Sequence, residues 1–221
     1  MVVATRLPLF PLDSVLVPGL VLPLHVFEQR YRVLVQALLE LPEDAERRFG
    51  VIATRSGREV GADGVDALHA VGCTAELREV TPYDDGRFDL VTVGENRFRL
   101  VGLDEDAGTP YHTGFVDFLP ERDGDGDVAA LARGVTARFG EYRERLGVDV
   151  TELPEQPQVV SYLVAAAVVL DLPERQALLE QPTTADRLRA ELEMLRREVA
   201  LVGAFRSLPA VELARDIGSP N

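Results

Sequence analysis

Three aspartates at alternate positions form the clearest cluster of potential metal ligands in the sequence. Asp123, Asp125 and Asp127 match the first three ligand positions of an EF-hand loop. The sixth position of such a loop requires glycine but is Val128, and the twelfth requires a bidentate glutamate but is Gly134. The pattern therefore favours an exposed acidic linker and predicts no metal site.

Cys73 and His69 have the residue types of a nucleophile and a general base. Their even spacing places them on one face of an expected strand, but four residues of strand separate them by about 13 Å. Because that distance exceeds hydrogen-bond reach, Cys73 is interpreted as a small core residue. His25 and His112 lack the spacing of a zinc site. Ser161 lies in an apolar helical stretch, where a hydroxyl usually bonds to the preceding turn.

All 23 residues in the lysine-plus-arginine count are arginine, and this excludes two chemistries. A Walker A loop requires a lysine that reaches the nucleotide phosphates, and a serine–lysine dyad requires an amine whose pKa falls on burial. No serine lies in a Gly-x-Ser-x-Gly motif. The sequence therefore predicts no catalytic residue, no cofactor and no enzymatic activity.

The formal charge of −14 and the sequence pI near 4.7 disfavour nucleic acid and anionic membranes as partners. An arginine stripe within an acidic chain is the alternative, although the arginines are scattered among carboxylates. A single cysteine excludes an internal disulfide, and the lack of a signal-peptide pattern predicts a cytoplasmic protein. The uncharged runs at residues 14–27 and 156–170 are shorter than the roughly 20 residues of a membrane span.

Residues 28–41 carry apolar side chains at helical spacing, which predicts an amphipathic helix that ends before Pro42. Asp84-Asp85-Gly86 predicts a hairpin turn. A series of antiparallel strands with one helix favours a small closed or partly closed barrel over a nucleotide-binding doubly wound sheet. The strands are expected where β-branched and aromatic residues are frequent, at residues 49–54, 67–83, 87–93, 97–103 and 113–119.

The polar segment 121–127 has the composition of an exposed linker, so we expect two subdomains, at residues 1–122 and 123–221. The stretch 159–170 is apolar nearly all round, which predicts the buried central helix of a bundle. The expected fold class is α+β, an antiparallel β pseudo-barrel with one packed helix followed by a C-terminal α-helical bundle. The bundle helices are expected at residues 128–146, 158–170, 173–180 and 183–205.

Residues 7–32 form an apolar run that four prolines and a glycine interrupt. Proline cannot donate a ladder hydrogen bond, so we expect short strand pieces joined by fixed turns and no regular central strand. Pro18-Gly19 suits a type II turn. The apolar residues around that turn are either buried in the core or exposed for a partner.

The run at residues 7–32 resembles the opening of the Lon protease N-terminal substrate-binding domain. The helical half resembles the C-terminal bundle of that family, through Ser161-Tyr162-Leu163 and residues 174–180. The resemblance extends over nearly the whole chain. Strand motifs occur in the same order as in the family: Phe49-Gly50-Val51 with Arg58-Glu59-Val60-Gly61, Val71-Gly72-Cys73-Thr74-Ala75, and Gly94-Glu95-Asn96-Arg97-Phe98-Arg99.

The resemblance implies a PUA-like pseudo-barrel followed by a helical bundle. In Lon proteases this region helps to recognise unfolded or tagged protein substrates and contributes to assembly. The sequence has no positions onto which the Lon Walker loop, or the catalytic serine and lysine, can be carried. It therefore resembles a stand-alone form of the domain without the ATPase and peptidase parts.

The leading hypothesis is a non-catalytic module that binds unfolded polypeptide or a protein partner, as an adaptor or regulator of proteolysis. Val17, Leu20 and Val21 beside the turn are the predicted contact residues, since burial of apolar side chains supplies most of the affinity for unfolded segments. Three alternatives stay open. They are a small-molecule site in the crevice between barrel and bundle, a hydrolase with a titratable group buried in that crevice, and RNA binding by a basic barrel face.

Overall fold

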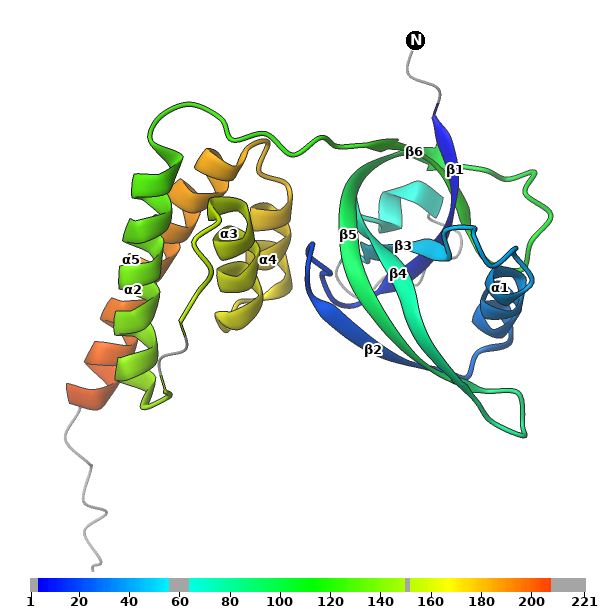
Figure 1. Ribbon diagram of the computed structural model, residues 1–221, viewed down its shortest axis with the longest axis horizontal. Coiled ribbons are helices and arrows are strands. Elements are labelled where there is room, and N and C mark those ends of the chain that lie inside the picture. The colour runs from blue at the N-terminus through cyan, green and yellow to red at the C-terminus, as the bar shows by residue number, and fades with distance from the viewer. Residues whose placement is uncertain (1–3, 56–63, 150–151, 208–221) are drawn as a thin grey trace, which may run out of the picture.

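The computed structural model describes residues 4–55, 64–149 and 152–207. They form an α+β fold of one six-stranded sheet and five α-helices. Figure 1 shows the strands and helix α1 (Gln29–Leu39) gathered in one part of the molecule, with the later helices side by side in another. The segment at residues 119–127 runs from the last strand to the first of these helices and connects the two parts.

The strands pair in the order β2-β5-β4-β3-β1-β6, and β5 also pairs with β6. The strands other than β2 therefore form a closed ring, in which each strand pairs with two others. β2 adds to β5 as an outer strand and has no second strand neighbour in the described ranges. The bounds are β1 (Thr5–Leu12), β2 (Val21–Val26), β3 (Arg48–Ala53), β4 (Val71–Pro82), β5 (Phe88–Leu103) and β6 (Thr113–Phe118).

The prediction of a wholly antiparallel sheet is wrong, because β1 and β3 run parallel. Parallel neighbours require a long crossover connection, which residues 13–47 supply with β2 and α1. The proline-rich run forms two short strands, β1 and β2, joined through the Pro18-Gly19 turn as predicted, although β1 lies between β3 and β6 in the strand order. Its first half pairs with β6 and its second half with β3. Pro8 and Pro11 therefore each pair with a strand on one side only. Proline, which lacks an N–H, is tolerated where the other side of the strand is unpaired.

β5 unites two predicted strands, residues 87–93 and 97–103, into one. Gly94, which lies between them, is hydrogen-bonded to the Pro18-Gly19 turn: the Gly19 N–H donates to the Gly94 carbonyl at 2.8 Å, and the Gly94 N–H donates to the Leu20 carbonyl at 2.9 Å. A Cβ at Gly94 would collide with the carbonyl oxygen of Val17. Glycine at this position lets the backbone of the turn approach β5 closely, and β5 continues through Gly94 without a break.

The predicted hairpin at Asp84-Asp85-Gly86 joins β4 to β5, and Gly86 has a φ of 80°. β4 begins at Val71, later than the predicted residue 67, because Gly64–Ala67 form a short 3-10 helix. His69 therefore precedes the strand, and the expectation that it shares a strand face with Cys73 is wrong. The motif at residues 58–61 lies outside the described residues.

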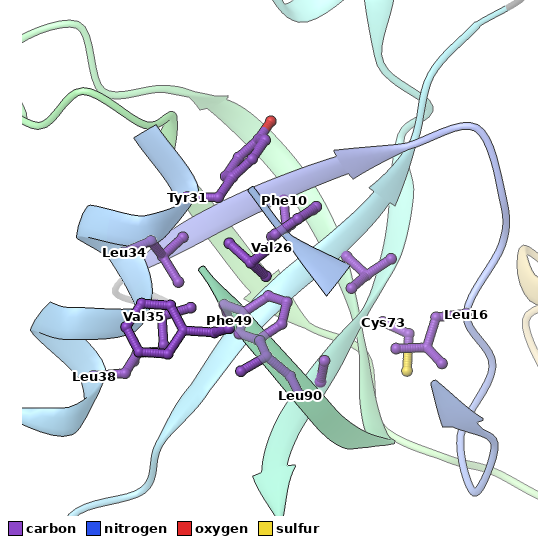
Figure 2. Close-up of a cluster of buried hydrophobic side chains, with 13 residues drawn as sticks. Phe10, Leu16, Val26, Tyr31, Leu34, Val35, Leu38, Phe49, Cys73 and Leu90 are labelled. Atoms are coloured by element: carbon purple, nitrogen blue, oxygen red, sulfur yellow. The ribbon is translucent and has the colours of Figure 1, made fainter. Parts of the chain in front are cut away.

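The apolar stripe of α1 packs against the ring of strands as predicted. Its residues Tyr31, Leu34, Val35 and Leu38 are buried. Figure 2 shows this stripe directed at Phe10, Val26 and Phe49, which come from three different strands. The rings of Phe10 and Tyr31 stack with centroids 4.0 Å apart. Cys73 is buried in the same cluster, in agreement with its interpretation as a core residue.

The helices of the second part share one apolar cluster. Asp127, from the EF-hand-like run, caps the first of them by accepting a hydrogen bond from the Ala130 N–H. The predicted buried helix at residues 158–170 is shorter than expected, because it ends at Ala167 and Val168 is extended. Val169 is 80% exposed, so this stretch is not buried all round. The bounds are α2 (Val128–Leu146), α3 (Pro157–Ala167), α4 (Leu172–Leu179) and α5 (Thr184–Ser207).

A buried polar network joins the sheet to the helices. Arg97 of β5 is 1% exposed and donates to the Glu121 carboxylate at 2.7 Å. It also donates to the backbone carbonyls of Leu179 at 2.8 Å and Gln181 at 2.6 Å. The same Glu121 oxygen accepts a hydrogen bond from the Tyr162 hydroxyl of α3 at 2.7 Å. The expectation of a fully exposed linker is therefore wrong at Glu121.

Arg187 of α5 adds a second buried guanidinium to this network. It donates to the Ser161 hydroxyl at 3.0 Å and lies 3.9 Å from the centroid of the Tyr162 ring. Its Nη2 is 3.7 Å from Glu121. Burial raises the pKa of Tyr162, so its hydroxyl stays protonated and donates to Glu121. The Glu121 carboxylate is thus the anion that two buried cations share.

We expect Arg97→Met to lower the free energy of unfolding by about 3–5 kcal/mol, because it breaks a buried ion pair and leaves two backbone carbonyls without their donor. Urea unfolding measures this change. Arg138→Met is the control, since Arg138 pairs with Glu141 on the exposed face of α2 and such pairs contribute about 0–1 kcal/mol. Equal losses in the two variants would contradict a stabilising role for the network.

Glu191 of α5 is fully buried, and neither carboxylate oxygen has a hydrogen-bond partner among the residues that the structure describes. Burial raises the pKa of Glu191 well above its ordinary value, and the Arg187 guanidinium lowers it by less. The folded state therefore keeps a proton that the unfolded state releases.

This protonation predicts a pH-dependent stability. As pH rises above 4.5, the ordinary value for glutamate, the unfolded state gains stability by ionising and the wild-type free energy of unfolding falls. Glu191→Gln removes that fall, so the variant gains stability relative to wild type as pH increases. Urea unfolding of both proteins between pH 4.5 and 8 measures the difference. A difference that stays constant with pH would contradict the assignment.

Candidate functional site

The Pro18-Gly19 turn lies where the sheet meets the helices. The Leu20 N–H donates to the Val17 carbonyl at 3.2 Å, and Gly19 has a φ of 81°, as a type II turn requires. The hydrogen bonds to Gly94 hold the turn against β5. The Val17 side chain consequently lies in a buried cluster with residues of the strands, of α3 and of α4.

The three predicted contact residues differ in exposure. Val17 is 1% exposed, so the prediction that it is an exposed contact is wrong; it packs in the cluster that contains Tyr162 and Leu179. Leu20 is half-buried and packs against the same cluster. Val21 is 56% exposed. The accessible surface therefore begins at Val21 and continues along β2, away from the turn.

Alternate residues of β2 point away from the core. Val21, Pro23 and His25 are exposed, and the residues between them are half-buried against the core cluster. Phe27, directly after the strand, is 63% exposed. We refer to Val21, Pro23, His25 and Phe27 as the β2 outer face. At strand geometry it spans about 20 Å, the length of an extended segment of six residues.

Beside this face, one edge of the β2 backbone pairs with no other strand in the described part of the chain. The Leu20 carbonyl accepts from Gly94 of β5, and the register continues this pattern through the even-numbered residues of β2. The carbonyls of Val21, Pro23 and His25 therefore point away from β5, as do the N–H groups of Val21 and His25. Pro23 has no N–H, and its place at an outward position leaves the β2–β5 ladder intact. Such an edge can accept an extended chain as a further strand.

Polar contacts with the β4–β5 hairpin hold His25 in place. Its Nδ1 lies 2.6 Å from one Asp89 carboxylate oxygen, and the other oxygen accepts from the Tyr83 hydroxyl at 2.5 Å. Its Nε2 lies 3.2 Å from Nη1 of Arg87, which can only donate, so Nδ1 carries the ring proton. The hydrogen bonds from Tyr83 and His25 lower the pKa of Asp89, and the bond to Asp89 raises the pKa of Tyr83. One end of the β2 outer face is thereby fixed.

The buried polar network at the junction offers no free titratable group of the kind that a hydrolase site would use. Arg97, Arg187 and Tyr162 converge there, but on Glu121 and on groups of the chain itself. Most of their polar atoms are hydrogen-bonded, although Nη2 of Arg187 and one oxygen of Glu121 have no hydrogen-bond partner among the described residues. Burial raises the pKa of the Cys73 thiol, which keeps it protonated and a poor nucleophile.

Residues of the acidic run 123–127 accept hydrogen bonds from the N-terminal ends of two helices. Asp127 caps α2, and the Asp123 carbonyl accepts a hydrogen bond from the Ala185 N–H at the start of α5. Among the described residues, no group of three or more histidine, cysteine or acidic side chains could hold a metal ion. No helix in the described part of the chain is long and apolar enough to cross a membrane.

The sequence analysis did not identify Pro23, His25 and Phe27 as surface residues. The feature of the sequence that could have identified them is their spacing, because they follow Val21 at intervals of two residues. Because the intervening residues are also apolar, the pattern alone does not say which set faces the core. The register with β5 decides it, since that pairing directs the even-numbered residues inward.

Comparisons with known proteins agree with this fold. The family model of the ATP-dependent protease La (LON) substrate-binding domain matches residues 6–197, so the chain belongs to this family. Lon protease 2 of Myxococcus xanthus is 30% identical over 201 residues, which are 87% of this chain and 24% of that protein. Lon protease of Anaeromyxobacter dehalogenans is 29% identical over 201 residues, covering 87% of this chain and 23% of the relative.

Two solved structures have the same architecture. The Lon N-terminal domain protein from Xanthomonas campestris matches with a TM-score of 0.63 and 27% identity, covering 86% of this chain and 98% of that chain. The N-terminal domain of Mycobacterium avium complex Lon protease matches with a TM-score of 0.68 and 17% identity, covering 87% and 98%. The chain spans about a quarter of the length of the curated relatives it matches. The matched region is the Lon substrate-binding domain and includes neither an ATPase nor a peptidase domain.

Proposed function

We propose that the chain is a non-catalytic polypeptide-binding module and that an unfolded segment binds along the β2 outer face. The observation that carries the proposal is the coincidence of exposed apolar side chains and an unpaired strand edge on β2. Apolar side chains supply affinity that depends little on sequence, and the edge supplies backbone hydrogen bonds common to every polypeptide. Both properties suit the recognition of diverse unfolded chains.

The family of the chain supports this role, because the family model describes a substrate-binding domain. We further propose that the ring of strands is a PUA-like pseudo-barrel and that α2–α5 form a bundle, with the subdomain boundary between residues 122 and 123. In this proposal the bundle buttresses the turn that precedes β2, through Tyr162 and Leu179. A role as an adaptor or regulator of proteolysis would follow if the bound segment is delivered to a protease.

Capture of a permanently unfolded reporter protein, with its cysteines blocked, tests the proposal. We expect Val21→Ser and Phe27→Ser each to weaken capture about tenfold or more, because each removes a side chain whose burial contributes about 1.5–3 kcal/mol. Binding is measured by fluorescence anisotropy of the labelled reporter. Both residues are exposed, so thermal unfolding of the variants should match that of wild type.

Val101→Ser is the matched control for this experiment. Val101 is 59% exposed on β5, close to the 56% of Val21, and it is not part of the β2 outer face. Capture by this variant should equal that of wild type. The proposed site is rejected if Val21→Ser and Phe27→Ser capture the reporter as well as wild type, or if Val101→Ser is equally impaired.

A further inference from the structure

A basic pocket lies at the junction of sheet and helices, in a chain of net charge −14. Its volume is about 240 Å³, below the roughly 300–1,000 Å³ of sites for drug-sized ligands. The pocket therefore suits one small group. It is lined by Arg97, Arg99, Leu119, Pro120, Arg122, Glu180 and Pro182.

Two of its arginines are available to a ligand. Arg97 is occupied by Glu121 and by two carbonyls, as described above. Arg99 and Arg122 are exposed, and within the described parts of the chain no side-chain hydrogen bond or ion pair involves either guanidinium. Asp117 is the cross-strand neighbour of Arg99 but forms no ion pair with it. Most other described arginines have a carboxylate or carbonyl partner. Two arginines without one in a single pocket are therefore unusual in this structure.

The backbones that carry these two arginines are fixed. Arg99 lies within β5 and is paired on both sides, with Val71 of β4 and Asp117 of β6. The Arg122 carbonyl accepts a hydrogen bond at 2.9 Å from the Thr184 N–H at the start of α5. The positions from which the two guanidiniums reach the pocket are therefore fixed, and only their side chains must become ordered when an oxyanion binds.

The composition of the walls favours a carboxylate on an apolar body. Each guanidinium offers a planar fork that matches a carboxylate in a bidentate manner. Glu180 also lines the pocket, where it accepts from Gln176 at 2.8 Å, and its negative charge opposes a dianion more than a monoanion. Leu119, Pro120 and Pro182 offer apolar surface to the rest of the ligand.

We propose that Arg99 and Arg122 bind the C-terminal carboxylate of a polypeptide whose last residue is apolar. This inference rests on the proposed function, because a polypeptide supplies the carboxylate. It adds a subsite that recognises a chain end, distinct from the β2 outer face, which recognises internal extended segments. Arg97 lines the subsite but is not available to the ligand, because it donates to Glu121 and to the Leu179 carbonyl.

Two labelled peptides that differ only at the C-terminus test the subsite. Both have the same apolar sequence without Asp or Glu; one ends in a free carboxylate and the other in an amide. We expect the amide to bind the full chain about tenfold more weakly, the effect of losing a hydrogen bond to a charged group. Arg99→Gln and Arg122→Gln should each weaken the carboxylate peptide about tenfold and leave the amide peptide unchanged. Arg99→Lys should give a partial loss, since lysine keeps the charge without the fork.

Arg133→Gln is the control, because Arg133 is exposed on α2 and its side chain also has no hydrogen-bond or ion-pair partner among the described residues. It should leave both peptides unaffected. The subsite is overturned if the two peptides bind equally, if neither binds at millimolar concentration, or if Arg99→Gln weakens both to the same extent. Failure of the proposed function is a separate result, namely reporter capture that is unchanged by Val21→Ser and Phe27→Ser.

Discussion

The carboxylate of Glu121 holds the two parts of the molecule in one arrangement. It accepts from Arg97 of the sheet and from Tyr162 of α3, and Arg187 of α5 lies beside it. A buried charge is tolerated only when its partners are fixed, so each of these elements must keep its position for the network to persist. The turn before β2 packs on the same Tyr162, which links the geometry of the exposed strand to the junction.

This arrangement explains why an apolar, proline-rich run can be partly buried and partly exposed. The turn at Pro18-Gly19 is pressed against Gly94 and buries Val17 between sheet and helices. β2 then leaves the junction with one edge bonded to β5 and the other paired with none of the described strands. Pro23 lies on that free edge, and a proline there also discourages uncontrolled pairing between copies of a sheet. Recognition of an extended chain and protection against aggregation can thus share one strand.

Local features of the fold could be predicted from the sequence. The apolar spacing in residues 28–41 located α1, the Asp84-Asp85-Gly86 turn located a hairpin, and the motifs of the run 7–32 pointed to the Lon substrate-binding domain family. Features that depend on distant partners could not be predicted. The parallel pairing of β1 with β3 and the unbroken course of β5 through Gly94 both follow from contacts far apart in the chain.

The exposure of the candidate site residues could likewise be predicted only in part. Val21 is exposed, as predicted, whereas Val17 was assigned to the surface and is buried, because nothing local distinguishes two valines that flank a turn. Glu121 was assigned to an exposed linker because residues 121–127 have a polar, glycine-containing composition, and the acidic residues that follow it are indeed exposed. Its buried partners Arg97 and Arg187 lie 24 and 66 positions away in the chain (121 − 97 and 187 − 121), beyond the reach of any local pattern.

Amide hydrogen exchange of the chain, with and without the unfolded reporter protein, tests the central claim most directly. If an extended segment pairs with the free edge of β2, the amides of Val21 and His25 exchange more slowly in the complex. The amides of Leu22 and Leu24, which face β5, keep their exchange rates. Unchanged exchange at Val21 and His25, with new protection confined to α2–α5, would contradict the account.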